Sequence, residues 1–147
     1  MKVISNTSPL IGFAKIARLP LLQQLFHRIL IPQKVYDEFF DECTAGEASH
    51  FHAVAPHFIT TVKVEQVSSF SRRLDRGERE VLTLALEEHA DFVILDDRKA
   101  FNEAVELHLS VVSTRTVLTF AEERGLIPSY QQIQEELRRN QFYVPKY

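Results

Sequence analysis

The chain has 147 residues, 17 Lys and Arg residues against 20 Asp and Glu residues, and a formal net charge of −3. This length and charge balance fit one globular domain and exclude a strongly basic coat protein for nucleic acid. The lone cysteine, Cys43, excludes an internal disulfide and a zinc site built on several cysteines, and it fits a reducing compartment. No apolar run is long enough to span a membrane and no signal peptide is recognisable, so we expect a cytoplasmic protein.

The first half of the chain alternates short apolar runs with segments of helical periodicity. In chain order we expect a strand at 3–4, helices at 8–17 and 20–26, a strand at 29–31, helices at 32–40 and 46–58, and a strand at 59–64. Ser8 is the expected N-cap of the first helix because Pro9 follows it at the first helical position.

The second half continues the alternation. In chain order we expect a turn at 75–77, an amphipathic helix at 78–88, a strand at 92–95, a helix at 100–107, a strand at 110–112, a helix to Phe120 capped by Thr114 or Thr116, and a last helix at 129–137. Short, wholly apolar strands between helices predict a parallel sheet covered on both faces, which is a three-layer α/β/α sandwich. We expect one domain over 1–147, in which 129–147 form a C-terminal helix and tail.

Polar side chains follow several of the predicted strands. Asn6, Glu38, Glu78, Asp96 and Asp97 fall at strand ends or in early helix turns, and ligand sites of such sheets lie beyond the carboxyl ends of the strands. Each residue also has a structural explanation, since acids favour the first turn of a helix and Asn favours caps and turns. Carboxylates gathered in one place would repel one another unless Mg²⁺ or Mn²⁺ held them together. A cluster of this kind points to metal-assisted hydrolysis of a phosphodiester.

Four blocks of the sequence stand out: VISNTSPLI at 3–11, Pro32 with Val35 and Glu38, the pair LDRGEREV at 74–81 and ADFVILDDR at 90–98, and GLIP at 125–128. Together they resemble the PIN-domain family, whose members are metal-dependent ribonucleases with a parallel-sheet α/β/α fold. The later blocks are closer still to one small bacterial and archaeal branch. The resemblance runs from Val3 to about Pro128.

The resemblance implies a set of site residues. The acidic quartet of the family falls on Asn6, Glu38, Glu78 and Asp96, with Asp97 as a supporting metal ligand. The hydroxyl that often follows the last core strand falls on Ser113 or Thr114. The family usually has Asp at the first position, and Asn6 keeps an oxygen ligand without its charge. The resemblance further implies an RNA substrate, an antitoxin partner protein, as in toxin–antitoxin pairs, and a homodimer.

Basic, histidine and aromatic groups allow further interpretations. RNA contacts, or equally a solvated surface, are expected at the arginines near the acidic residues: Arg72, Arg73, Arg76, Arg79, Arg98 and Arg115. The spacing of His50, His52 and His57 does not favour a zinc site, because residues two apart lie on different faces of a helix. The apolar tail at 142–145 is expected to pack on the body of the protein or on a partner.

The leading prediction is a Mg²⁺- or Mn²⁺-dependent endoribonuclease, the toxin of a toxin–antitoxin pair. The alternative is a PIN-like module that binds RNA or protein and cleaves weakly or not at all, because Asn6 replaces an acid. A phosphoacceptor domain of flavodoxin-like architecture fits less well. In such domains the acid pair follows the first strand and a Lys follows the last one, whereas here Asp96 and Asp97 follow a late strand and no Lys lies near Ser113.

Overall fold

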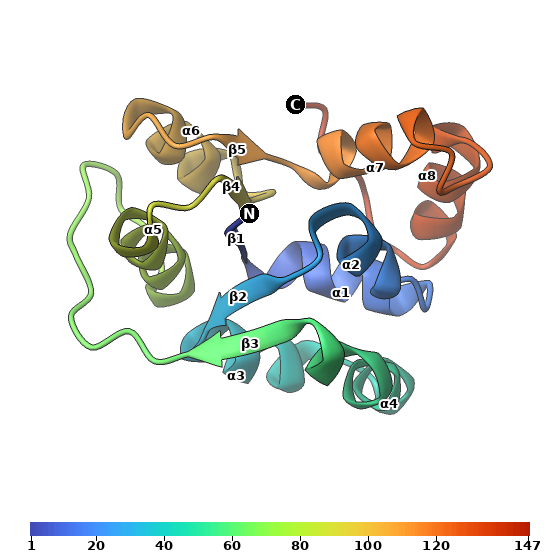
Figure 1. Cartoon of the computed structure of the whole chain (residues 1–147), viewed down its shortest axis with the longest axis horizontal. Coiled ribbons are helices and arrows are strands. Elements are labelled where there is room, and N and C mark those ends of the chain that lie inside the picture. Colours follow the sequence, from blue (N-terminus) through green and yellow to red (C-terminus); the bar gives the residue numbers. More distant parts are fainter.

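A computed structural model describes the whole chain, residues 1–147, and shows one five-stranded sheet (Figure 1). The strands are β1 (Val3–Ser5), β2 (Ile29–Pro32), β3 (Ile59–Val62), β4 (Phe92–Ile94) and β5 (Val111–Val112). They lie in the order β3-β2-β1-β4-β5, and every neighbouring pair is parallel. The parallel α/β fold predicted from the apolar strands is confirmed.

Eight α-helices and one 3-10 helix surround this sheet. They are α1 (Thr7–Lys15), α2 (Pro20–Phe26), α3 (Gln33–Glu42), α4 (Ala45–Val54), η1 (Ala55–His57), α5 (Arg76–Glu88), α6 (Arg98–Glu106), α7 (Thr114–Glu123) and α8 (Tyr130–Arg139). Helix α1 packs against α3 and α4, whereas α5 packs across β1, β2 and β4. The chain runs outward from β1 to β3 and then crosses back to β4, so right-handed crossovers place these two groups on opposite faces of the sheet.

Several helix starts differ from those expected. The first helix begins at Thr7 rather than Ser8, because Asn6 still donates its backbone N–H to Ile94 O at 3.0 Å and the helix starts directly after that strand pairing. The 75–77 segment is not a free turn: Asp75 is the N-cap of α5, which begins at Arg76. The N-cap position of α7 belongs to Ser113, not to Thr114 or Thr116.

The helix expected at 46–58 is also shorter than predicted. A capping box between Thr44 and Glu47 starts α4 at Ala45, and Pro56 falls in the 3-10 turn that follows Val54. The strand after it ends at Val62, two residues earlier than expected. These differences move the ends of elements but leave their order unchanged.

The tail after α8 packs on the body of the protein. Phe142 is buried, and its ring lies against Gly12 of α1, where an added Cβ would come within 2.8 Å of Phe142 Cζ. From there the chain returns past the carboxyl end of β4 to Tyr147, near the start of α7 (Figure 1). None of the helices is both long and apolar enough to cross a membrane.

Candidate active site

A cavity of about 410 Å³ lies at the carboxyl ends of β1, β2 and β4. Its lining consists almost entirely of polar residues: Asn6, Thr7, Ser8, Glu38, Glu42, Asp75, Glu78, Asp96, Asp97, Tyr143 and Pro145. The four positions of the predicted quartet, and Asp97 with them, therefore lie around one cavity, which we call the carboxylate cavity. They come from separate elements and are brought together by the parallel sheet.

Asn6 lines the carboxylate cavity at the junction of β1 and α1. It is 8% exposed and its backbone is extended, so the side chain leaves the strand end directly toward the cavity. Its amide oxygen Oδ1 is buried and has no hydrogen-bond partner. A buried acceptor without a partner carries a desolvation penalty of about 1–3 kcal/mol. Asn6 thus presents one unpaired oxygen in a cavity lined by carboxylates.

Glu38 reaches the cavity from the second turn of α3. Thr7 Oγ1 donates a hydrogen bond to Glu38 Oε2 at 2.9 Å, which fixes the carboxylate beside the start of α1. The carboxylate also lies close to Gly77, where an added Cβ would come within 2.7 Å of Glu38 Oε1. Burial raises the pKa of Glu38, and the charge of Asp75 adds to this rise, while the Thr7 hydrogen bond opposes it.

Glu78 is placed by the capping box that starts α5. Glu78 N donates to Asp75 Oδ1 at 2.8 Å, and Asp75 N donates to Glu78 Oε1 at 3.0 Å. The side chain is 9% exposed. Burial raises the pKa of Glu78 to about 7, and repulsion from Asp75 and Asp97 contributes to the rise. The carboxylate therefore carries its charge at a cost that a cation would relieve.

Asp96 follows β4 and is held by the first residue of α7. Thr114 donates twice, from its N–H to Asp96 Oδ1 and from its hydroxyl to Asp96 Oδ2, both at 2.7 Å. Burial raises the pKa of this carboxyl, and the two hydrogen bonds from Thr114 oppose the rise. The Tyr147 hydroxyl donates to the Asp96 carbonyl oxygen, and Ser113 Oγ donates to Tyr147 O. Of the two predicted hydroxyls, Thr114 contacts the acid and Ser113 contacts the tail.

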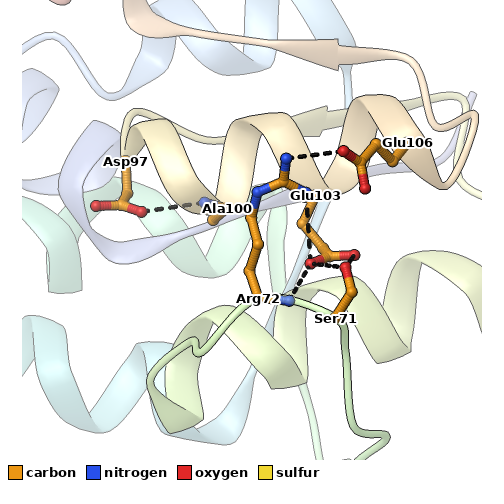
Figure 2. Close-up of polar contacts among 6 residues, drawn as sticks. All are labelled: Ser71, Arg72, Asp97, Ala100, Glu103 and Glu106. Carbon is orange, nitrogen blue, oxygen red and sulfur yellow. Dashed lines mark hydrogen bonds and ion pairs between the residues drawn. The ribbon is translucent and has the colours of Figure 1, made fainter.

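Asp97 lines the same cavity from the N-cap of α6. Its Oδ2 accepts a hydrogen bond from Ala100 N at 3.0 Å, so one oxygen caps the helix (Figure 2). The side chain is exposed, and its charge contributes to the raised pKa of Glu78. Both the structural and the functional explanation of Asp97 therefore apply at once.

The oxygen atoms that line the carboxylate cavity are of the chemical type that a hard divalent cation prefers. All the side chains concerned offer oxygen atoms, three carboxyls have raised pKa values, and Asn6 Oδ1 lacks a partner. As the side chains stand, no three of them are arranged to hold one ion, because each carboxylate is turned to a donor of the chain itself. Side-chain rotations would be needed to direct these oxygens to a common point.

Comparison with known proteins decides the family. A family model described as a PIN domain, DUF3368, matches residues 2–147. The chain belongs to the PIN-domain family. Among solved structures, a PilT N-terminus domain protein from the hyperthermophilic archaeon Sulfolobus solfataricus P2 has a similar fold, with a TM-score of 0.64 and 16% identity over 81% of this chain and 92% of that chain. A search of the curated proteins finds no match. Membership of the family supports a nuclease-type fold.

The predicted arginines of this PIN domain lie outside the carboxylate cavity, whose lining contains no basic side chain. Arg72 is held by Glu103 and Glu106 of α6 (Figure 2). Arg76 pairs with Glu80, and Arg98 lies over the ring of Tyr147. No ion pair involves Arg73, Arg79 or Arg115. The histidine group has structural partners too, since His50 Nε2 accepts a hydrogen bond from Leu19 N at 3.2 Å.

Sequence reasoning missed several residues that line the cavity of this PIN domain. Asp75 was expected in a turn, although the spacing D-x-x-E of Asp75 and Glu78 is a capping-box signal that would have placed it beside the site. Thr7 follows Asn6 directly and could have been found from that position. Tyr143 and Pro145 arrive from the far end of the chain, and no local pattern indicates where a tail without helix or strand will lie.

Proposed function

We propose that the protein is a metal-dependent endoribonuclease that hydrolyses RNA phosphodiester bonds. The observation that carries this proposal is the presence of Asn6, Glu38, Glu78 and Asp96, from four separate places in the sequence, around one cavity. The PIN-domain family supports the nuclease class of activity. Mg²⁺ or Mn²⁺ is the cofactor that oxygen ligands of this kind favour.

The residues have distinct roles in this proposal. Glu38, Glu78 and Asp96 would hold the cation, with Asn6 Oδ1 as a neutral ligand and Asp97 as support. A divalent cation supplies Lewis acidity, which lowers the pKa of water and stabilises the charge that develops at phosphorus. Thr7 and Thr114 act as positioning residues, because their hydroxyls fix the carboxylates of Glu38 and Asp96.

The biological setting is part of the same proposal. We propose a cytoplasmic, homodimeric, single-domain toxin that cuts RNA and is silenced by a small antitoxin protein. The support is the resemblance of the sequence blocks to a small bacterial and archaeal branch of the PIN-domain family, a family in which many members are toxins. The family match over residues 2–147 supports the PIN-domain part of this proposal.

The Asp96→Asn variant tests the nuclease assignment. Asn keeps one oxygen to accept from Thr114 N, and its amide can donate to Thr114 Oγ1, so the fold is expected to stay intact. We expect Mn²⁺-dependent cleavage of a labelled RNA to fall at least a hundredfold, because a charged ligand is lost at the reacting centre. Asp41→Asn, an exposed change on the same α3 helix that carries Glu38, is the matched control and is expected to cleave normally. Cleavage by Asp96→Asn at the wild-type rate would refute the assignment.

A second function is favoured by Asn6 itself. With an amide in place of an acid, the cavity has one charge fewer to hold a cation, and the protein would bind RNA or a protein partner without cutting. Calorimetric titration with Mn²⁺ separates the two functions: no binding at millimolar metal, together with RNA binding, favours the module without activity. Asn6→Asp is then expected to raise Mn²⁺ affinity at least tenfold, whereas Asn102→Asp on α6 leaves it unchanged.

A further inference from the structure

A second polar cavity, of about 380 Å³, lies beside the carboxylate cavity at the ends of β2 and β3. Its lining comes from the start of α3, the segment after β3 and the start of α5: Gln33, Lys34, Asp37, Lys63, Val64, Arg76 and Glu80. We call it the basic cavity, because three cationic side chains from three different elements meet there. None of the roles discussed above uses Lys34 or Lys63.

The charges of the basic cavity leave its two lysines without an ion pair. Lys34 and Lys63 form no ion pair. Glu80 is buried, and its Oε2 accepts from Arg76 Nε at 2.8 Å, which fixes the arginine at the cavity wall while about half of its side chain stays exposed. The other acid, Asp37, accepts a hydrogen bond from Gln33 Nε2 at 3.0 Å. Three cations against two acids give the cavity a net positive charge.

The two cavities are neighbours along two helices. Lys34 and Glu38 lie one turn apart on α3, which is about 6 Å along the axis at 1.5 Å per residue. The positive charge of Lys34 acts on Glu38, whose pKa it lowers against the larger effect of burial. On α5, Arg76 lines the basic cavity and the preceding Asp75 lines the carboxylate cavity.

The carboxylate cavity by itself is a poor anchor for a polyanion. Its lining holds six carboxylates and no basic side chain, so the affinity for an RNA strand must come from cations outside it. Lys34, Lys63 and Arg76 share a cavity beside it, and Lys34 and Arg76 lie on α3 and α5, the helices that carry Glu38 and Glu78. Lysine and arginine bind phosphate oxygens through charge-assisted hydrogen bonds and do not read the base.

We propose that the basic cavity binds a backbone phosphate of the RNA strand, next to the phosphodiester that lies over the carboxylate cavity. The identity of the strand as RNA rests on the proposed nuclease function. The contact is independent of base identity. Because the basic cavity lies on the β2–β3 side of the carboxylates, the contact also defines the line along which the strand crosses the protein.

The test measures binding separately from cleavage. Fluorescence anisotropy of a labelled twelve-nucleotide oligouridine RNA is recorded in EDTA, so that binding is followed without metal-dependent hydrolysis. The double variant Lys34→Ala/Lys63→Ala, called the pocket variant, is compared with Lys2→Ala/Arg28→Ala, called the control variant. The control variant removes two cations that precede β1 and β2 at the opposite edge of the sheet. Lys63→Glu, at an exposed position outside helix and strand, serves as a second variant that leaves the packing untouched.

We expect the pocket variant to bind the RNA at least tenfold more weakly than wild type at low salt. Its plot of log K against log salt is expected to lose about 0.7 in slope for each phosphate contact removed, while the control variant changes little. Lys63→Glu is also expected to weaken binding, because it replaces a cation of the basic cavity by an anion. Equal affinities and slopes in the pocket and control variants, or no RNA binding by the wild-type protein, would overturn the inference.

Failure of this inference and failure of the nuclease proposal give different results. If wild type cleaves RNA with Mn²⁺ but the pocket variant binds like the control, the basic cavity is not the phosphate site and the nuclease proposal stands. If wild type binds RNA without cleaving it and the pocket variant loses binding, the phosphate site stands and the nuclease proposal fails.

Discussion

At the scale of single residues, the charged forms of the carboxylates in the carboxylate cavity are electrostatically unfavourable in the folded protein. Glu38, Glu78 and Asp96 all have raised pKa values because each is buried, and the charge of Asp75 raises the pKa of Glu38 and Glu78 further. Their hydrogen bonds to Thr7, Asp75 and Thr114 offset part of this cost. Groups that destabilise the fold in this way are typical of sites that a ligand completes.

The pH dependence of stability is expected to show this cost at Glu78. Its pKa rises from 4.5 to about 7 on folding, so the folded chain binds this proton more tightly than the unfolded chain between those values. Stability contributed by the proton is therefore lost as pH rises from 4.5 to 7. Glu78→Gln keeps the capping oxygen and carries no charge, so we expect it to stabilise the metal-free protein at pH 8 by about 1–3 kcal/mol.

Urea denaturation at pH 8 and pH 5 measures this effect. The advantage of Glu78→Gln over wild type is expected to be largest at pH 8 and to shrink at pH 5, where the wild-type carboxyl is mostly protonated. Glu87→Gln, an exposed change on the same helix, is the control and is expected to show no such pH dependence. A Glu78→Gln effect that is the same at both pH values would contradict the raised pKa.

At the scale of elements, α6 connects the site to the long segment between β3 and α5. Its N-cap residue Asp97 lines the carboxylate cavity, and one and a half turns later Glu103 is 3% exposed (Figure 2). Glu103 accepts from Ser71 Oγ at 2.9 Å and from Arg72 N at 2.7 Å. The segment held in this way ends at Asp75, the residue that caps α5 and positions Glu78.

Loss of Glu103 is expected to release this segment. Glu103→Ala leaves the Ser71 hydroxyl and the Arg72 N–H without their acceptor, which costs about 0.5–1.5 kcal/mol for each hydrogen bond lost, because Ser71 is exposed and Arg72 is half-buried. We expect trypsin to cleave faster after Arg72 and Arg73 under native conditions, as measured by mass spectrometry of the fragments. We also expect weaker Mn²⁺ binding. Glu106→Ala removes only the exposed partner of Arg72 and is expected to leave the cleavage rate close to that of wild type. Equal cleavage of both variants would show that Glu103 does not anchor the segment.

At the scale of the whole molecule, the sequence was sufficient to predict the fold and to predict that the quartet positions lie around one cavity. Buried strands such as β4 read as apolar runs, and a parallel sheet brings all carboxyl ends to one edge. For this reason Asn6 and Asp96, ninety residues apart, were both expected at the cavity that they line. Periodicity and topology are properties of long stretches of chain, so errors of one or two residues at helix ends do not change the result.

Side-chain partners depended on contacts that no local pattern records. Ser113 was expected to serve the site with its hydroxyl, yet the hydroxyl donates to Tyr147 in the tail. The tail itself was expected to pack on the protein or on a partner, and the structure shows that Phe142 packs on α1. The path of the tail past Asp96 could not be predicted from the sequence. A segment without helix or strand has no periodicity that indicates which surface it covers.

The tail is expected to be a structural wall of the carboxylate cavity that depends on Phe142. Phe142→Ala removes a buried aromatic ring beside Gly12, which costs about 3 kcal/mol in the free energy of unfolding and frees residues 143–147. Hydrogen exchange followed by mass spectrometry is expected to show faster exchange in the 142–147 segment, with the strands unchanged. Tyr143→Ala, at a side chain that is 73% exposed, is expected to change stability by less than about 0.5 kcal/mol. If Phe142→Ala exchanges in this segment at the wild-type rate, Phe142 does not hold the tail against the cavity.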